Sequence, residues 1–216
     1  MNDRARRVVG ELLSAHGRTY AEEAGIRLRD TPQPLYRLQV LSLLLSARIR
    51  ASVAVAAARA LHEAGLRDPR RMAGAGWQDR VDALGRGGYR RYDERTATQL
   101  GDGAKLLTER WGGDLRRLRA EAGGGVPALR RLLQEIPGVG PTGADIFLRE
   151  VQRVWPEAAP YLDAKALSGA ERLGLPKDPD RLLKLAGDTE PAVLAAALVR
   201  AALDEKVAED SLRRSA

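Results

Sequence analysis

The sequence predicts an all-α protein, and three observations carry this prediction. Apolar residues recur three and four positions apart along most of the 216-residue chain, which is the spacing of one face of a helix. No stretch alternates apolar and polar residues at the period of a strand for long. Prolines and glycine clusters such as residues 123–125 separate the apolar segments, as breakers between helices do.

Taken in chain order, the elements follow from this spacing. Helices are expected over residues 5–16, 35–47, 53–66, 69–72, 77–84, 93–111, 115–119, 127–135, 144–154, 164–173, 180–185 and 191–203. The second of these is almost wholly apolar, so we expect it to be buried. Residues 204–216 are rich in charge and are expected to form a charged tail.

One turn predicts a ligand site. Pro137 ends the preceding helix, because the residue before a proline disfavours helical geometry. Gly138 and Gly140 add backbone freedom and leave no side chain in the way of a ligand. Thr142 and Asp145 fit a capping box, so the next helix is expected to begin at Thr142. Free N–H groups at that helix start predict a phosphate-binding site.

Composition indicates the class of partner. Lysine and arginine number 36 against 29 acidic residues, which gives a net charge of +7 and an isoelectric point near 10.1. A polyanion is therefore the expected macromolecular partner, with a merely soluble basic protein as the alternative. Residues 1–7 are not followed by an apolar signal segment, and no run reaches membrane-spanning length. We therefore expect a soluble cytoplasmic protein.

The cofactor classes are narrowed by the same composition. The chain has no cysteine, which excludes a disulfide framework, a thiolate zinc site and a cysteine-ligated iron–sulfur cluster. It has only two histidines, so a histidine-built metal site is not expected either. No side-chain metal site and no cofactor are predicted.

Four short motifs occur in order along the chain. They are Leu44-Leu45-Ser46-Ala47-Arg48, Gly88-Tyr89, Ile136-Pro137-Gly138-Val139-Gly140 and Tyr161-Leu162-Asp163-Ala164-Lys165. Together they resemble the Leu-Leu-Ser-Ala-Gln loop, the Gly-Leu-Tyr turn, the hairpin and the Val-Asp-Thr-His segment of the helix-hairpin-helix DNA glycosylases, in the endonuclease III branch. The ordered set is far more specific than any single motif.

The resemblance implies a two-lobed helical fold that grips DNA. A central helical barrel is expected over residues 30–163, with the helix-hairpin-helix motif at 129–154. A second lobe is expected from residues 1–29 and 164–216. Relatives often carry a four-cysteine iron–sulfur cluster at the carboxy terminus, which this chain cannot ligate. The resemblance adds a monovalent cation bound by hairpin carbonyls. The expected partner is double-stranded DNA containing a damaged base, bound by a nucleoid-associated monomer.

The resemblance also assigns the chemistry. Asp163 corresponds to the family's catalytic aspartate, which stabilises positive charge on the sugar and activates water; by sequence alone it is an N-cap, and both roles are compatible. Thr142 stands where bifunctional members have a lysine, so Schiff-base strand cleavage through that position is lost. Lys165 is the one lysine near Asp163 in sequence, and phosphate contact is favoured for it over a role as substitute nucleophile.

The remaining residues are assigned to DNA binding and to the base pocket. Arg48 takes the place of the family's gap-filling glutamine, with an ordinary surface arginine as the alternative. Tyr89 either lines the pocket or is a buried structural tyrosine. The full set expected to bind DNA is Gly138, Val139, Gly140, Thr142, Arg48, Arg86, Arg90 and Arg91, and that expected at the base pocket is Arg48, Tyr89 and Ser46. For the arginines of the glycine-rich turn, a solvated charged turn is the alternative.

These assignments predict a monofunctional DNA glycosylase of base-excision repair that flips out a damaged base and hydrolyses its N-glycosidic bond. AP lyase activity is expected to be weak or absent. Two alternatives stay open: a noncatalytic DNA-binding or damage-recognition protein, and a bifunctional enzyme that uses Lys165. Residues 41–45 lack the glutamate of adenine-excising relatives, which argues against that activity. Oxidised pyrimidines fit the branch best, while alkylated purines and mismatches stay open.

Overall fold

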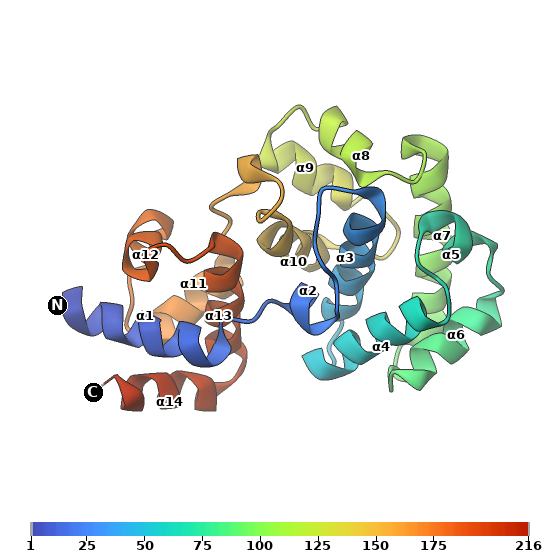
Figure 1. Ribbon diagram of the computed structural model, residues 1–216. Coiled ribbons are helices and arrows are strands. Elements are labelled where there is room, and N and C mark those ends of the chain that lie inside the picture. Colours follow the sequence, from blue (N-terminus) through green and yellow to red (C-terminus); the bar gives the residue numbers. More distant parts are fainter. Residues whose placement is uncertain (1, 216) are drawn as a thin grey trace. The chain divides into compact units, whose positions relative to one another are not determined.

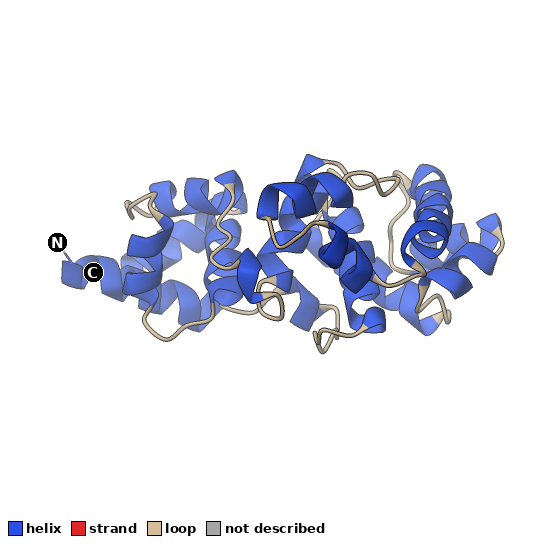
Figure 2. Cartoon of the chain, turned by 90° about the horizontal axis from the view of Figure 1, so that it is seen from above, coloured by secondary structure: helices blue, strands red, loops and turns tan. Residues whose placement is uncertain are grey.

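The computed structural model describes residues 2–215, and within them the regular elements are helices (Figures 1 and 2), which confirms the all-α prediction. The chain divides into two compact units, described separately below. The terminal unit comprises Met1–Tyr20 and Ala158–Ala216, and the central unit comprises Ala21–Glu157. Within residues 2–215, no helix is both long enough and apolar enough to cross a membrane.

The unit boundaries lie elsewhere than the sequence predicts. Residues 21–29 belong to the central unit because their backbone is bonded to it: the Ala21 amide donates to the Glu150 carboxylate at 3.0 Å, and the Arg37 guanidinium donates to the Ala24 carbonyl at 3.3 Å. The second boundary follows Glu157 rather than residue 163. Asp163 therefore belongs to the terminal unit.

The central unit is built around one apolar helix, α3. The elements here are α2 (Tyr20–Glu23), α3 (Pro32–Leu45), α4 (Ala51–Glu63), α5 (Pro69–Gly74), α6 (Trp77–Arg86), α7 (Asp93–Trp111), α8 (Leu115–Glu121), α9 (Val126–Leu133), α10 (Pro141–Val151) and η1 (Pro156–Ala158), of which α2 and η1 each include one residue assigned to the terminal unit. Helix α3 is buried on nearly all sides because it packs on α4, α8 and α10. The short α2 and η1 were not predicted.

The terminal unit is built around α13 (Pro191–Leu203), whose side chains are mostly buried. It also contains α1 (Asn2–His16), α11 (Ala164–Arg172), α12 (Pro179–Ala186) and α14 (Glu205–Arg214). Helix α11 packs closely on α13, since a Cβ at Gly169 would lie 1.9 Å from the Leu198 carbonyl oxygen. Only glycine fits there.

The prediction that residues 204–216 form a charged tail is wrong. Residues Glu205–Arg214 form α14, which packs on α1 and α13 and buries Ala208 and Ser211. Asp204 caps the helix by accepting a hydrogen bond from the Lys206 amide at 3.0 Å. The charges that suggested a tail occupy the exposed face of an amphipathic helix.

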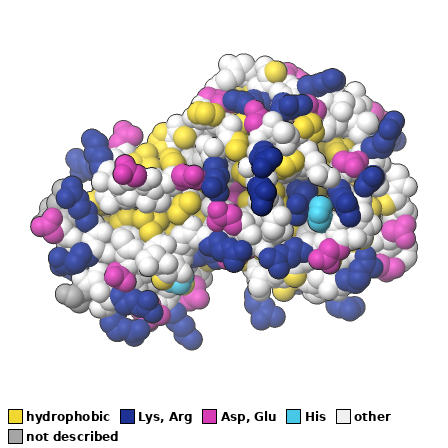
Figure 3. Space-filling model, viewed as in Figure 1, with side chains coloured by type: hydrophobic (Ala, Val, Ile, Leu, Met, Phe, Trp, Pro, Cys, Tyr) yellow, Lys and Arg dark blue, Asp and Glu magenta, His cyan; other side chains and the backbone are white. Residues whose placement is uncertain are grey.

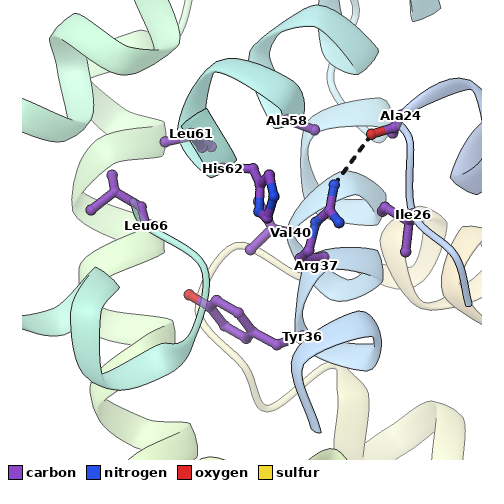
Figure 4. Close-up of a pocket in the computed structure, with 9 residues that line it drawn as sticks. All are labelled: Ala24, Ile26, Tyr36, Arg37, Val40, Ala58, Leu61, His62 and Leu66. Carbon is purple, nitrogen blue, oxygen red and sulfur yellow. Dashed lines mark hydrogen bonds between the residues drawn. The ribbon is translucent and has the colours of Figure 1, made fainter. Parts of the chain in front are cut away.

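A small cavity in the central unit lies between α3, α4 and the segment around Ile26 (Figure 4). Its volume is about 10 Å³, and roughly 10–15 Å³ is needed to hold one water. Within residues 2–215, the buried Tyr36 hydroxyl and His62 Nδ1 at this cavity have no hydrogen-bond partner. Burial raises the pKa of the Tyr36 hydroxyl. A cavity of this size is a packing feature and not a pocket for a flipped base.

Candidate nucleic-acid interface

The turn between α9 and α10 is a tight hairpin. Helix α9 ends at Leu133, and Ile136 buries its side chain almost completely. The Val139 amide then donates to the Ile136 carbonyl at 2.9 Å, which closes the turn. Gly138 has φ +86°, a left-handed conformation that residues with a side chain rarely adopt.

The hairpin backbone lies directly on two helices of the central unit. A Cβ at Gly138 would lie 2.7 Å from Leu43 Cδ1 of α3 and 3.0 Å from Gln99 Cβ of α7. A Cβ at Gly103 of α7 would lie 3.3 Å from the Pro137 carbonyl oxygen. Glycine is therefore required at Gly138 both by φ and by space, because the turn packs closely on α3 and α7.

The next helix begins at Pro141, so the prediction of Thr142 as its N-cap is wrong. Gly140 is the N-cap, without a side-chain cap bond, because proline is well suited to the first helical position. The Asp145 carboxylate does not close a capping box. It pairs with Arg130 of α9, Oδ1 to Nε at 2.6 Å and Oδ2 to Nη2 at 3.2 Å.

This helix start presents free amides. In the first turn of α10, the Thr142 and Gly143 amides have no acceptor four residues earlier within the helix, and the first backbone bond of the helix runs from the Ala144 amide to the Gly140 carbonyl at 3.0 Å. Gly140 and Thr142 are both exposed. The helix dipole adds partial positive charge at this end. The arrangement is suited to binding a phosphate.

The Ser46–Arg48 loop lies beside the hairpin. A Cβ at Gly143 of α10 would lie 3.7 Å from Ser46 Cβ and 3.8 Å from the Ser42 carbonyl oxygen. Ser46 is the C-cap of α3, and its hydroxyl donates to the Leu43 carbonyl in the last turn of the helix at 2.7 Å. Arg48 follows in the loop and is exposed. Two of the predicted motifs are thus brought together in the central unit.

The glycine-rich turn after α6 is a helix cap. The Tyr89 amide donates to the Leu84 carbonyl and the Gly88 amide to the Gly85 carbonyl, which is the Schellman pattern. Tyr89 is 2% exposed, and its hydroxyl lies 3.2 Å from Thr96 Oγ1 of α7. Burial raises the pKa of this hydroxyl. These contacts favour the structural interpretation of Tyr89 over the pocket interpretation.

The three arginines of this turn differ in their surroundings. Arg90 and Arg91 are exposed, and the Arg91 guanidinium lies 5.2 Å from the centre of the Tyr92 ring. Arg86 lines a hollow together with Asp79 and Asp82. The negative charge of these two carboxylates repels a phosphate and so opposes its binding at Arg86. Many basic side chains cover the face seen in Figure 3. Arg90 and Arg91 are the better candidates for phosphate contacts.

Asp163 is the N-cap of α11 in the terminal unit. Its Oδ1 accepts a hydrogen bond from the Ala166 amide at 3.1 Å, and the side chain is half-buried. Lys165 lies in the first turn of the same helix and is exposed. The capping role is therefore present, and a carboxylate has further acceptor sites beyond this bond. The catalytic role of Asp163 stays a prediction.

The residues offer little to a metal. Among residues 2–215, no group of three or more histidine, aspartate or glutamate side chains is placed to hold a metal ion. The iron–sulfur cluster of the relatives does not fit this chain, because its thiolate ligands have no counterpart in a sequence without cysteine.

Together, these features define an all-α fold with a tight, closely packed hairpin that exposes the start of a helix. Among solved structures, the chain is similar to an endonuclease III trapped as a covalent intermediate with DNA, in an estranged-adenine complex. The TM-score is 0.54 at 16% sequence identity, and the match covers 93% of this chain and 85% of the other. No protein-family model matches the chain, and no curated protein matches it. The chain thus has the helix-hairpin-helix glycosylase fold.

The residues that pack against the hairpin were not predicted from the sequence. Leu43 and Gln99 contact Gly138, and the Arg130–Asp145 pair joins the flanking helices. Leu43 and Gln99 are distant from the hairpin in sequence. The only available signal was the apolar pattern of 35–47, which placed Leu43 on a buried helix without naming its neighbour.

Proposed function

We propose that this protein is a DNA glycosylase of base-excision repair that removes a damaged base by hydrolysis, without strand cleavage. The observation that carries the proposal is the hairpin: Gly138 with φ +86° packed against α3 and α7, followed by the exposed amide-rich start of α10. The fold match supports it, since the matched endonuclease III is bound to DNA.

In this proposal, DNA binding begins at the hairpin. The backbone amides of Gly138, Gly140 and Thr142 bind a phosphate of one strand, while the Val139 amide closes the turn between them. Arg48, which shares the central unit and lies in the loop beside the hairpin, fills the gap left by the flipped base and bonds to its orphaned partner. Arg90 and Arg91 add phosphate contacts, with Arg86 in a weaker role. A monovalent cation at the hairpin carbonyls is part of the proposal.

Asp163 performs the chemistry. Its carboxylate stabilises the positive charge that develops on the sugar as the N-glycosidic bond breaks, and it activates the attacking water. Thr142 has a hydroxyl where a lysine amine would be required, and a hydroxyl forms no imine. Abasic sites are therefore the expected product.

The experiment is a lesion panel on the full chain. Duplexes with oxidised pyrimidines, alkylated purines or mismatches are incubated with the protein, then heated in alkali to reveal abasic sites. Excision of at least one lesion, with few breaks before alkali, supports the proposal. If no lesion yields abasic sites while duplex binding persists, the protein is a DNA-binding or damage-recognition module instead.

The bifunctional alternative has its own readout. Borohydride reduces a Schiff base to a stable covalent adduct, so trapping on abasic duplex detects an attacking amine. Wild-type protein is expected to give no adduct. An adduct that disappears in Lys165→Ala but persists in Lys177→Ala, a control lysine of the same unit, would establish Lys165 as the nucleophile.

A further inference from the structure

The terminal unit contains a large open hollow that the proposed function does not use. It lies between the start of α1, the segment after α11, and α12, and its volume is about 1120 Å³. Its floor is apolar: Val8, Leu173 and Leu175 lie buried at its base, and Ala5, Pro176 and Leu185 are partly exposed on it. Figure 3 shows hydrophobic side chains gathered on this unit, with both basic and acidic side chains around them.

The rim of the hollow is basic. Arg4 and Arg6 come from α1, and Arg181 and Lys184 come from α12. All four are exposed, and the lining contains no acidic residue. In the part of the chain that the structure describes, none of these four side chains forms an ion pair or a side-chain hydrogen bond. Four unpaired cations around an apolar floor favour an anionic partner with an apolar face.

The size of the hollow decides between kinds of ligand. Small-molecule pockets measure roughly 300–1,000 Å³ and are largely enclosed, whereas this hollow is larger and open. Two turns of a helix, about 10–12 Å across and about 11 Å long, occupy roughly 800–1,200 Å³. A helical segment of another protein therefore matches the space better than a metabolite does.

We propose that this hollow, which we call the α1–α12 groove, binds an acidic amphipathic helix of a partner protein. Leucine-like side chains spaced three and four residues apart pack on the partly exposed Ala5, Pro176 and Leu185 of the floor. Aspartate or glutamate side chains on the flanks of the helix pair with Arg4, Arg6, Arg181 and Lys184. Duplex DNA satisfies the cations but offers no apolar face to the floor, so the helix is the occupant that uses both features.

The test uses fluorescence anisotropy with the full chain and a small set of labelled helical peptides of about 14 residues, roughly four turns. Each carries leucines on one face and glutamates beside them. At least one is expected to bind with a micromolar Kd that weakens severalfold between about 50 and about 300 mM NaCl. Matched peptides with lysine in place of glutamate, or serine in place of leucine, are expected to bind at least tenfold more weakly.

Variants locate the site. Arg181→Glu/Lys184→Glu reverses two rim charges and is expected to weaken peptide binding at least tenfold. Arg70→Glu/Lys105→Glu makes the same change in net charge at exposed positions of the central unit and is expected to leave peptide binding unchanged. Circular dichroism checks that each variant is folded, and lesion excision measured in parallel keeps this proposal separate from the proposed function.

Three outcomes overturn the proposal. One is that no glutamate peptide binds below about 100 μM, which corresponds to a free energy weaker than about −5.5 kcal/mol. Another is equal binding of the lysine peptides. The third is that a duplex displaces the peptide and that the rim variant, unlike the control variant, loses affinity for the duplex by the same factor as for the peptide. That result would make the groove a nucleic-acid surface.

Discussion

Arg130 of α9 and Asp145 of α10 form a two-pronged ion pair across the hairpin, at 2.6 and 3.2 Å. The pair joins the helices on either side of the Gly138 turn, and it anchors the first turns of α10, where the free amides lie. The side chains remain 37% and 20% exposed, so solvent weakens the attraction relative to a fully buried pair. Its geometric effect on the hairpin is the more important consequence.

Asp145→Asn is expected to loosen this connection. The change keeps the size of the side chain but removes the charge, and the expected loss is about 1 kcal/mol of unfolding free energy, measured by urea denaturation. Asp210→Asn is the control, because Asp210 pairs with Arg213 on an exposed face of α14; a change within about 0.5 kcal/mol is expected there. Equal effects of the two would mean that the hairpin pair has no special role.

Gly138 and Gly140 provide a matched comparison within one turn. Gly138→Ala is expected to cost about 2–4 kcal/mol, since it combines a left-handed backbone with contacts to Leu43 and Gln99. Gly140 has φ −86° and nothing within 4 Å of a Cβ, so Gly140→Ala is expected to leave stability unchanged within about 0.5 kcal/mol. If this backbone binds phosphate, Gly140→Ala weakens the affinity of the protein for duplex DNA. Unchanged affinity in folded Gly140→Ala would remove Gly140 from the interface.

The helical periods allowed most elements to be predicted, because burial of an apolar face repeats locally along the chain. The failures occurred where local signals compete. At Thr142 and Asp145 the capping-box pattern was present, but Pro141 starts the helix one residue earlier, and Asp145 finds its partner on another helix. At α14 the high charge obscured an amphipathic pattern whose buried face, at Ala208 and Ser211, is made of small residues.

The candidate site was predictable to a similar extent. The Gly138 turn was visible in the sequence because proline and glycine impose backbone geometry locally. The support beneath it was not, since Gln99 lies on a helix distant in sequence. Tyr89 shows the same limit: its position in a glycine-rich turn was clear, but its burial against Thr96 depends on the packing of α6 on α7.

Asp163 allows folding and catalysis to be tested separately. Asparagine is as good an N-cap as aspartate, so Asp163→Asn is expected to fold with near wild-type stability and to lose at least about 100-fold in excision, a typical effect of removing an acid–base group. Asp163→Ala removes the cap as well and is expected to cost about 1 kcal/mol. Asp178→Asn is the control, because Asp178 caps α12 of the same unit. Full excision by Asp163→Asn would contradict the catalytic role.

The exposed arginines predict that the affinity for duplex DNA falls as the salt concentration rises. Each phosphate contact contributes about 0.9 to the slope of log affinity against log salt concentration. Arg90→Ala/Arg91→Ala is therefore expected to reduce this slope by about 2, measured by titrating a duplex at several NaCl concentrations. Arg86→Ala, beside Asp79 and Asp82, is expected to change it by less than one unit. An unchanged slope in the double variant would make the turn a solvated surface.

His62 predicts a loss of stability on mild acidification. Burial lowers its pKa below the ordinary value near 6.5, and Arg37 and Arg67 act in the same direction against a smaller opposing effect of Glu63. The unfolded chain therefore binds the proton first, so the free energy of unfolding falls as the pH drops from about 7 to about 5.5. The carboxylates with lowered pKa, which are Asp114, Glu121 and Glu157, lose their stabilising effect only at more acidic pH. Urea denaturation at both pH values is expected to show a smaller loss of unfolding free energy for His62→Gln than for wild type.

His16 contributes with the same sign, since burial lowers its pKa too. Part of the pH dependence of stability is therefore expected to persist in His62→Gln and to decrease further in the double variant with His16→Gln. An identical pH dependence in wild type and double variant would contradict this origin.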